Sequence, residues 1–219
     1  FSMELAVGEA LGIIGPNGAG KSTLFNLITG GISPDQGVVT FNGVDVTRMP
    51  GYQRCRAGMG RSYQIPHPFD GMTVFENLLV GAAFGDANSE SACYAPCVEI
   101  LELTGLSDKA NVLAGSLTLL ERKRLEMARA LATNPTLLML DEIAGGLTEH
   151  EVAELVGNIR NIHAKGISII WIEHIVHALM SVVGRLIVIN FGRKLDDGDP
   201  ETVLNSPAVQ EIYMGIAVE

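Results

Sequence analysis

The sequence of 219 residues predicts one α/β domain whose mostly parallel sheet carries helices on both faces. Three observations favour this fold class. Short apolar runs that suit buried strands alternate with stretches of helical periodicity. A glycine-rich turn, Gly15–Gly20, joins the first strand to the first helix. Asn42-Gly43, between Val38–Phe41 and Val44–Val46, predicts a small antiparallel hairpin beside the main sheet.

The elements of the core follow from these patterns. The first strand is expected at Ala10–Ile14 and the first helix at Ser22–Ile28. Gly30 and Gly31 should end that helix, because glycine readily adopts the left-handed conformation of a helix C-terminus. Later strands are expected at Leu137–Leu140, Ile167–Ile172 and Arg185–Ile189.

The middle of the chain is expected to be helical. Thr73 and Glu76 form a capping-box pattern that should start a helix. Helical periodicity returns at Val98–Leu103 and Glu121–Ala132. We therefore expect a helical subdomain over residues 65–134, inserted into a nucleotide-binding core of residues 1–64 and 135–219. Because the chain opens in what reads as the middle of a strand, we also expect that N-terminal strands are missing.

Composition excludes several classes of function. The net charge of −10 disfavours nucleic-acid binding. No apolar run reaches the roughly 18 residues that cross a bilayer, and no signal peptide is evident, so any membrane role should come through a partner. Cys55, Cys93 and Cys97 are too few for a disulfide framework, and ordinary thiols in a reducing compartment are the expected reading.

The segment Gly15–Ser22 matches the phosphate-loop pattern G-x-x-x-x-G-K-[ST] between a strand and a helix. Its glycines let backbone N–H groups surround phosphates, and Lys21 should reach the β- and γ-phosphates of a nucleotide. The Ser22 hydroxyl should bind Mg²⁺. The candidate nucleotide-binding residues are Gly15, Pro16, Asn17, Gly18, Ala19, Gly20, Lys21, Ser22 and Thr23. An incidental glycine-rich turn is the alternative.

Asp141 and Glu142 follow the buried strand Leu137–Leu140, at the end where ligands collect in open α/β sheets. Asp141 is expected to hold Mg²⁺ through water, and Glu142 to act as general base on the attacking water. By itself, such a pair is more often a polar turn or a helix cap. His174 follows the strand Ile167–Ile172 and could contact the γ-phosphate, although a lone histidine is usually structural. A structural role is also expected for three other histidines, His150, His163 and His177.

With these motifs in order, the chain resembles the ATP-binding-cassette (ABC) family over essentially its whole length. The phosphate loop, Gln64 as the glutamine loop, the acidic strand ending at Glu142 and His174 as the switch histidine all match. The resemblance implies a P-loop ATPase fold with ATP and Mg²⁺ as cofactors. It implies that Gln64 touches Mg²⁺ and that the helical insertion docks a short helix of a membrane subunit. It places the aromatic residue that stacks on adenine before residue 1.

Within that family the chain looks like the importer ATPases for branched-chain amino acids, with urea and lipopolysaccharide transporters as alternatives. The matching phrases are Gly71–Leu79, Arg124–Arg129 and Pro207–Gly215. The resemblance implies a peripheral protein at the cytoplasmic face of the membrane. Its implied partners are transmembrane permease subunits, a second ATPase subunit, and a periplasmic or extracellular solute-binding protein that acts through the permease.

The family signature L-S-G-G-Q is degenerate here. Its positions hold Leu117, Thr118, Leu119, Leu120 and Glu121. Leu119 and Leu120 should make any left-handed backbone there costly. Ile143 replaces a usual proline, and Thr148 a usual aspartate. A heterodimer could supply the partner's signature to this phosphate loop; alternatively, the protein closes poorly and hydrolyses slowly. A catalytically silent structural subunit and a non-transport member of the family are the remaining readings.

Overall fold

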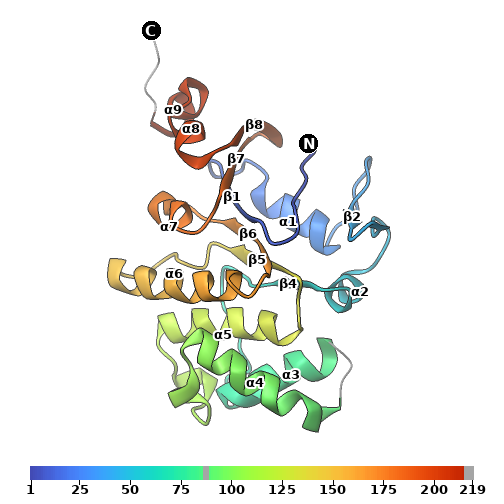
Figure 1. Ribbon diagram of the computed structural model, residues 1–219, viewed down its shortest axis with the longest axis vertical. Helices are drawn as coiled ribbons and strands as arrows, with labels where there is room; N and C mark the ends of the chain where they lie inside the picture. Colours follow the sequence, from blue (N-terminus) through green and yellow to red (C-terminus); the bar gives the residue numbers. More distant parts are fainter. Residues whose placement is uncertain (86–88, 215–219) are drawn as a thin grey trace.

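The computed structural model describes residues 1–85 and 89–214. A six-stranded sheet has the order β4-β5-β6-β1-β7-β8, in which only β8 runs antiparallel to its neighbour. Helices α3, α4 and α5 gather beyond the β4 edge of the sheet, far from β7 and β8 (Figure 1). This arrangement confirms the predicted fold class of a mostly parallel α/β core with an inserted helical region, whereas the exact subdomain boundaries stay a prediction.

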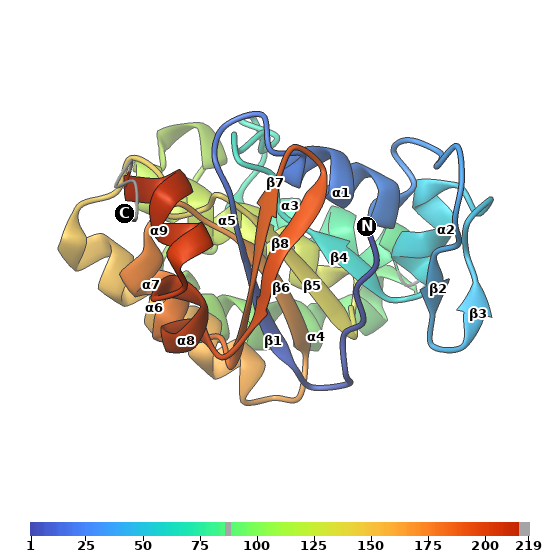
Figure 2. The same ribbon diagram turned by 90° about the horizontal axis from the view of Figure 1, so that it is seen from above.

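The strands of the main sheet are short and buried at its centre. They are β1 (Ala10–Ile14), β4 (Met59–Arg61), β5 (Leu137–Asp141), β6 (Ser168–Ile172), β7 (Arg185–Asn190) and β8 (Arg193–Gly198). The predicted hairpin is present but shorter than expected, with β2 at Thr40–Phe41 and β3 at Val44–Asp45. Asn42 (φ 49°) and Gly43 (φ 78°) both adopt left-handed conformations, which a tight hairpin turn of this type requires. The hairpin lies beside α2 (Figure 2).

The helices are α1 (Lys21–Thr29), α2 (Gly51–Arg56), α3 (Val74–Gly85), α4 (Glu90–Thr104), α5 (Leu119–Ala132), α6 (Glu149–His163), α7 (Val176–Met180), α8 (Pro200–Leu204) and α9 (Pro207–Met214). Gly30 caps α1 with φ 78°, as expected. The predicted capping box also forms, because the Thr73 N–H and hydroxyl both donate to Glu76 and Thr73 Oγ1 accepts from the Glu76 N–H. None of the described helices is both long enough and apolar enough to span a bilayer.

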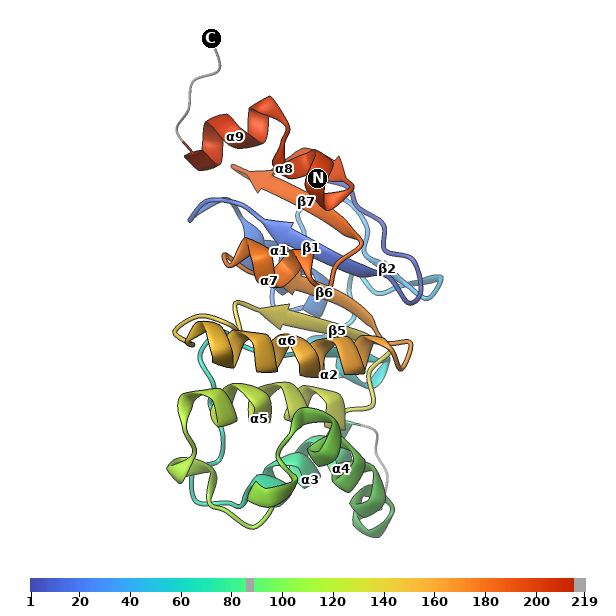
Figure 3. The ribbon, with the colours of Figure 1, turned by 60° about the vertical axis from the view of Figure 1, so that its left-hand side comes forward.

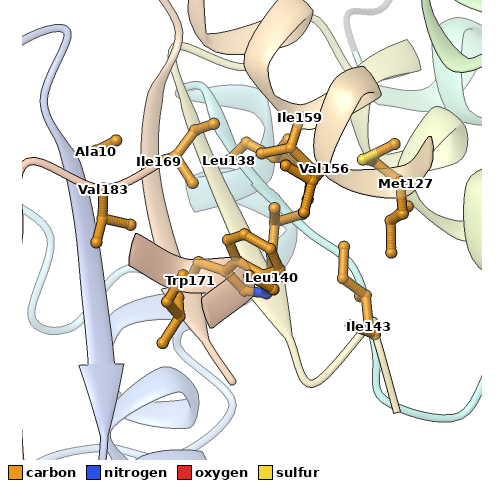
Figure 4. Packing of buried hydrophobic residues seen from close by; sticks show 14 of the residues in the cluster. Ala10, Met127, Leu138, Leu140, Ile143, Val156, Ile159, Ile169, Trp171 and Val183 are labelled. Atoms are coloured by element: carbon orange, nitrogen blue, oxygen red, sulfur yellow. The ribbon is translucent and has the colours of Figure 1, made fainter. Parts of the chain in front are cut away.

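Side chains alternate between the two faces of the sheet, which therefore builds two cores. Leu138, Leu140 and Trp171 point to the face covered by α5, α6 and α7, where they pack with Val156 and Ile159 of α6 (Figures 3 and 4). On the opposite face, Leu11, Ile13, Met139 and Ile172 pack with Phe25 of α1. The helical region has a third core of its own, formed between α3, α4 and α5. Burial on both faces explains the continuous apolar runs in the sequence of these strands.

Candidate functional site

The phosphate-loop segment folds as a tight turn between β1 and α1. A Cβ atom on Gly15 would clash with the carbonyl oxygen of Ile189 in β7, so only glycine fits there. Gly18 (φ 80°) and Gly20 (φ 104°) adopt left-handed conformations that other residues rarely accept. The turn ends at the N-terminus of α1, whose free N–H groups and dipole favour an anion.

Lys21, the first residue of α1, points back into this turn. Its side chain is buried, and Nζ donates to the carbonyl oxygens of Gly15 (2.7 Å) and Pro16 (3.1 Å). Burial lowers the pKa of Lys21, whereas the nearby carboxylates of Glu142 and Asp141 act in the opposite direction. The ammonium group therefore lies at the centre of a loop that can surround phosphate oxygens.

The remaining candidate residues reach the same edge of the sheet from other strands. β1 pairs with β6, and β6 pairs with β5, all in parallel, so their carboxyl ends meet beside the turn. Asp141 and Glu142 come from the end of β5 and His174 from the end of β6, while Gln64 follows β4. The structure thus brings together residues that are up to 159 positions apart, as the interval from Gly15 to His174 shows.

Glu142 is the residue on which these segments converge. Gln64 Nε2 donates to Glu142 Oε2 at 2.6 Å, and His174 Nε2 lies 2.8 Å from Glu142 Oε1. The Glu142 backbone has φ 46°, an uncommon conformation for a non-glycine residue, and its N–H donates to Ile172 O at 2.8 Å. Both carboxylate oxygens are therefore fixed in direction, as a base that must meet a bound water requires.

Asp141 has a partner that the sequence analysis missed. Arg61 Nη2 lies 2.7 Å from Asp141 Oδ2, and both side chains are about nine-tenths buried. The guanidinium also donates to Asn26 Oδ1 at 2.7 Å, and its central carbon lies 5.3 Å from the centre of the Phe25 ring and 4.9 Å from that of Tyr63. The sequence offered only a basic residue three positions before Gln64, which is too weak a signal to assign a role.

Glu173 was also missed, because it reads as the polar end of a strand. It is buried, and its carboxylate accepts the backbone N–H groups of Ala144 (3.0 Å) and His174 (3.1 Å). Burial raises the pKa of Glu173, while these two hydrogen bonds oppose that shift. Glu173 thereby ties the segment that carries His174 to the loop that follows Glu142.

Comparison with known proteins decides the family. The ABC transporter family matches residues 1–145, about two thirds of the chain. The branched-chain amino acid transport ATP-binding protein LivG of Salmonella typhimurium is 38% identical over 99% of this chain and 91% of its own length. The chain belongs to the ABC transporter family.

The cassette has further relatives in sequence and structure. BraF of Pseudomonas aeruginosa, also a branched-chain amino acid transport ATP-binding protein, is 35% identical over 95% of this chain and 88% of its own length. The ADP conformation of the cassette MJ1267 superposes with a TM-score of 0.89 at 32% identity, covering 99% of this chain and 91% of that one. A nucleotide-free cassette gives 0.87 at 32% identity, covering 98% and 91%. These findings confirm the predicted family and its ATPase activity.

The residues expected to form the signature lie at the start of α5. Leu117 precedes the helix, Thr118 caps it, and Leu119 and Leu120 are its first two residues. Thr118 and Glu121 form a capping box, with Glu121 Oε2 accepting the Thr118 N–H at 2.8 Å. Both leucines are helical, so the left-handed backbone that they would make costly is not required here. Leu120 is instead buried in the core and Leu119 packs against Gly146.

The other departures from the family pattern have local explanations. Ile143, in place of proline, is fully buried in the core below α6. Thr148, in place of aspartate, caps α6 through a capping box with Glu151. Both residues therefore have structural roles in this cassette.

The residues given a structural reading lie outside the site. His163 Nε2 lies 2.9 Å from Gly8 O, His150 Nδ1 lies 3.1 Å from Glu154 Oε1, and His177 is exposed on α7. Cys93 and Cys97 are buried free thiols of α4, and Cys55 is a half-buried free thiol. The phrase Pro207–Gly215 falls on α9 except for Gly215, which lies outside the described residues.

Among residues 1–85 and 89–214, no three carboxylate, histidine or cysteine side chains cluster as a metal site would require. Mg²⁺ needs few protein ligands, because phosphate and water oxygens supply most of its coordination. Ser22, Gln64 and Asp141 offer isolated oxygen donors of the kind that Mg²⁺ prefers. Asp141 Oδ2 accepts from Arg61 Nη2 at 2.7 Å. The donor set fits a nucleotide-bound magnesium ion.

Proposed function

We propose that this cassette is the ATP-hydrolysing subunit of an importer for branched-chain amino acids at the cytoplasmic face of the cell membrane. The observation that carries the ATPase mechanism is the Glu142 carboxylate, held between Gln64 and His174 at the edge of the sheet where the phosphate loop lies. The solute is proposed from the two relatives, LivG and BraF, which are named as ATP-binding proteins of branched-chain amino acid transport.

Residues 15–23 bind the phosphates of ATP. The backbone N–H groups of the loop and the N-terminus of α1 face the anion, and the Lys21 ammonium neutralises charge on the β- and γ-phosphates. When bound, Mg²⁺ neutralises charge on the phosphates. The Ser22 hydroxyl would hold it directly, Gln64 would contact it, and Asp141 would contribute through water.

Glu142 takes a proton from the water that attacks the γ-phosphorus. The new P–O bond forms as the bond to the β–γ bridging oxygen breaks, so that ADP and inorganic phosphate leave. Gln64 and His174 fix the Glu142 carboxylate before the reaction, and His174 also faces the γ-phosphate. Preorganisation of this kind lowers the cost of arranging the water and the base during the reaction.

A cavity beside the glutamine loop suits the docking of a permease. It has a volume of about 490 Å³ and lies between α1 and α2 on one side and α3 and α5 on the other. Tyr52 and Tyr63 line it with exposed aromatic rings. We propose that a short permease helix fills this cavity, so that movement of the permease and movement of Gln64 are coupled. A solute-binding protein acts on the other side of the membrane through the same permease.

The signature leads us to propose a heterodimer with a second ATPase. Leu119 gives the N-terminus of α5 a bulky, half-exposed side chain where the family has glycine. The partner's signature would close on this phosphate loop, leaving one strong and one weak composite site. The alternative is a homodimer that hydrolyses slowly.

The test is Mg²⁺-dependent ATP turnover by the complete transporter. The transporter is reconstituted from this chain and from the second ATPase and permease subunits that neighbouring genes encode. We expect turnover that falls about 10²-fold or more in Glu142→Gln, because the general base is lost. Glu201→Gln, an exposed carboxylate on α8, is the matched control and should keep full turnover. The ATPase proposal fails if wild-type and Glu142→Gln transporters turn over equally.

A nucleotide-binding structural subunit is the second candidate, favoured by Leu119 and Leu120 alone. It predicts ATP binding with no turnover attributable to this chain. Uptake by proteoliposomes then separates solutes: labelled leucine should accumulate, whereas urea should not. Accumulation of urea in place of leucine would reject the branched-chain assignment while leaving the ATPase intact.

A further inference from the structure

Lys123 is a buried lysine of α5 to which neither the motifs nor the proposed reaction gives a role. Only 4% of the residue is exposed. Its Nζ donates to the carbonyl oxygens of Gln64 (3.1 Å) and Glu142 (3.4 Å). Burying an ammonium group is costly unless it is well paired. An apolar residue of similar size would fill the same space without the cost of burying a charge. The presence of a lysine here therefore needs an explanation other than packing.

The contact with Glu142 bears on the backbone that aims the proposed base. A left-handed conformation at a non-glycine residue costs about 1–2 kcal/mol and persists only where the surroundings impose it. The N–H of Glu142 donates to Ile172 O in β6, and its carbonyl oxygen accepts from Lys123 Nζ (3.4 Å) and from the backbone N–H of Gly145 (3.4 Å). The lysine thus helps to hold the carbonyl group of Glu142, which the sheet does not hold.

The contact with Gln64 is one of several hydrogen bonds between side chains of α5 and the backbone of the glutamine loop. One turn after Lys123, the buried carboxylate of Glu126 accepts the backbone N–H groups of Tyr63 and His67. One turn further, Arg129 Nη1 donates to His67 O at 2.8 Å. Three side chains at a spacing of three residues therefore hold the loop backbone from one face of the helix.

Of these three side chains, Lys123 is the one that contacts both Gln64 and Glu142, whose side chains are hydrogen-bonded to each other. Gln64 Nε2 and Glu142 Oε2 are 2.6 Å apart, while Lys123 binds the backbone of each residue. The lysine also lies in the first turns of α5, two residues after the end of the expected signature Leu117–Glu121. A displacement of α5 would thus move both backbones together.

We propose that Lys123 is a positioning residue for hydrolysis. It holds the backbones of Gln64 and Glu142 at the separation at which their side chains meet, and it transmits movement of the signature helix to the base. This inference rests on the proposed ATPase function, because it concerns the geometry of the same base. Lys123 itself neither touches the nucleotide nor transfers a proton.

The experiment compares Lys123→Met, Lys123→Arg and Arg124→Met in the assembled transporter. Methionine keeps the length of the side chain but removes the donors, whereas arginine keeps them. Arg124 is the matched control, because it is a cation on the same helix that pairs with Glu154 of α6 (2.6 Å) rather than with the loop. Lys123→Gln, whose shorter, uncharged side chain carries an amide NH₂ group, replaces the methionine variant if that variant does not assemble.

We expect kcat of Lys123→Met to fall about tenfold or more, because misplacement by about 1 Å can cost up to 10²-fold. The KM for ATP should stay within about twofold, since the phosphate loop is untouched. Lys123→Arg should recover much of the loss, and Arg124→Met should keep wild-type kcat. Unchanged kcat per assembled transporter in Lys123→Met, or an equal loss in Arg124→Met, would overturn the proposal.

Amide hydrogen exchange supplies a readout that does not need hydrolysis. Peptides covering residues 63–67 and 142–146 should exchange faster in Lys123→Met than in wild type or Arg124→Met. If the wild-type transporter showed no turnover, the ATPase proposal would fail, and faster exchange would still support the positioning role. Unchanged exchange in both peptides would overturn it.

Discussion

The ion pair between Arg61 and Asp141 allows a quantitative prediction about the core of the site. The two side chains are 10% and 8% exposed, and Nη2 and Oδ2 are 2.7 Å apart. Two unit charges about 4 Å apart interact by ~4 kcal/mol at the effective dielectric constant that reproduces data near protein surfaces. Arg61→Met removes this attraction and leaves the Asp141 carboxylate buried without its ion-pair partner.

We expect Arg61→Met to lower the free energy of unfolding by about 3–5 kcal/mol, the range found when one partner of a buried pair is removed. Asp141→Asn in the same background removes the uncompensated charge. The double variant should therefore lose at least about 1 kcal/mol less than the sum of the two single losses.

Urea denaturation of the nucleotide-free protein measures all four variants of this cycle. The midpoint should shift while the slope of the transition stays constant, so that the change reflects stability and not a change in the surface exposed on unfolding. Additivity of the two single losses to within about 0.5 kcal/mol would refute the reasoning, because it would show that the two charges do not interact.

Three further predictions concern other parts of the molecule. Gly15→Ala should abolish ATP binding in a nucleotide-binding assay and lower the melting temperature, because the new methyl group clashes with Ile189 O. Hydrogen bonds from Arg185 lower the pKa of Asp197 to about 2, so this carboxylate stabilises the protein above about pH 4, and the stabilisation is lost as the pH falls toward 2. Asp197→Asn should lower the free energy of unfolding by about 2 kcal/mol at pH 7. The urea midpoint of this variant should also depend less on pH between about pH 4 and 2 than that of the wild type. Burial raises the pKa of Cys97 to about 11, so iodoacetamide at pH 8 should label it far more slowly than a small free thiol, as mass spectrometry would show.

Local patterns with a direct physical cause were predicted well from the sequence. The strand, turn and helix around Lys21 follow from an apolar run, glycines and a terminating Gly30, all within 21 residues. The hairpin at Asn42-Gly43 and the helix start at Thr73 depend on turn and capping residues that act within three or four positions.

The missed elements lack such local signals. β8 (Arg193–Gly198) has a mostly polar sequence because it is an edge strand in which no residue is fully buried. α2 (Gly51–Arg56) buries only Arg54, whose guanidinium satisfies backbone carbonyl groups of residues 27, 28, 47 and 49. Neither pattern shows the apolar periodicity from which elements are predicted.

The sequence predicted which residues belong to the site, but it did not predict how their side chains are arranged. Motif order identified Gln64, Glu142 and His174, but their hydrogen bonds depend on strand order and on the left-handed backbone of Glu142. Arg61 and Lys123 were missed because their roles arise from burial among groups distant in sequence. The sequence did not show that Leu119 and Leu120 are helical, because that depends on Thr118 capping α5 just before them.

Single-turnover hydrolysis of radiolabelled ATP by the assembled transporter tests the central claim most directly, because it isolates the chemical step from transport and product release. Wild type should release labelled phosphate, whereas Glu142→Gln should bind ATP with similar affinity and release it about 10²-fold more slowly or worse. Equal single-turnover rates in the two transporters would contradict the assignment of Glu142 as the base.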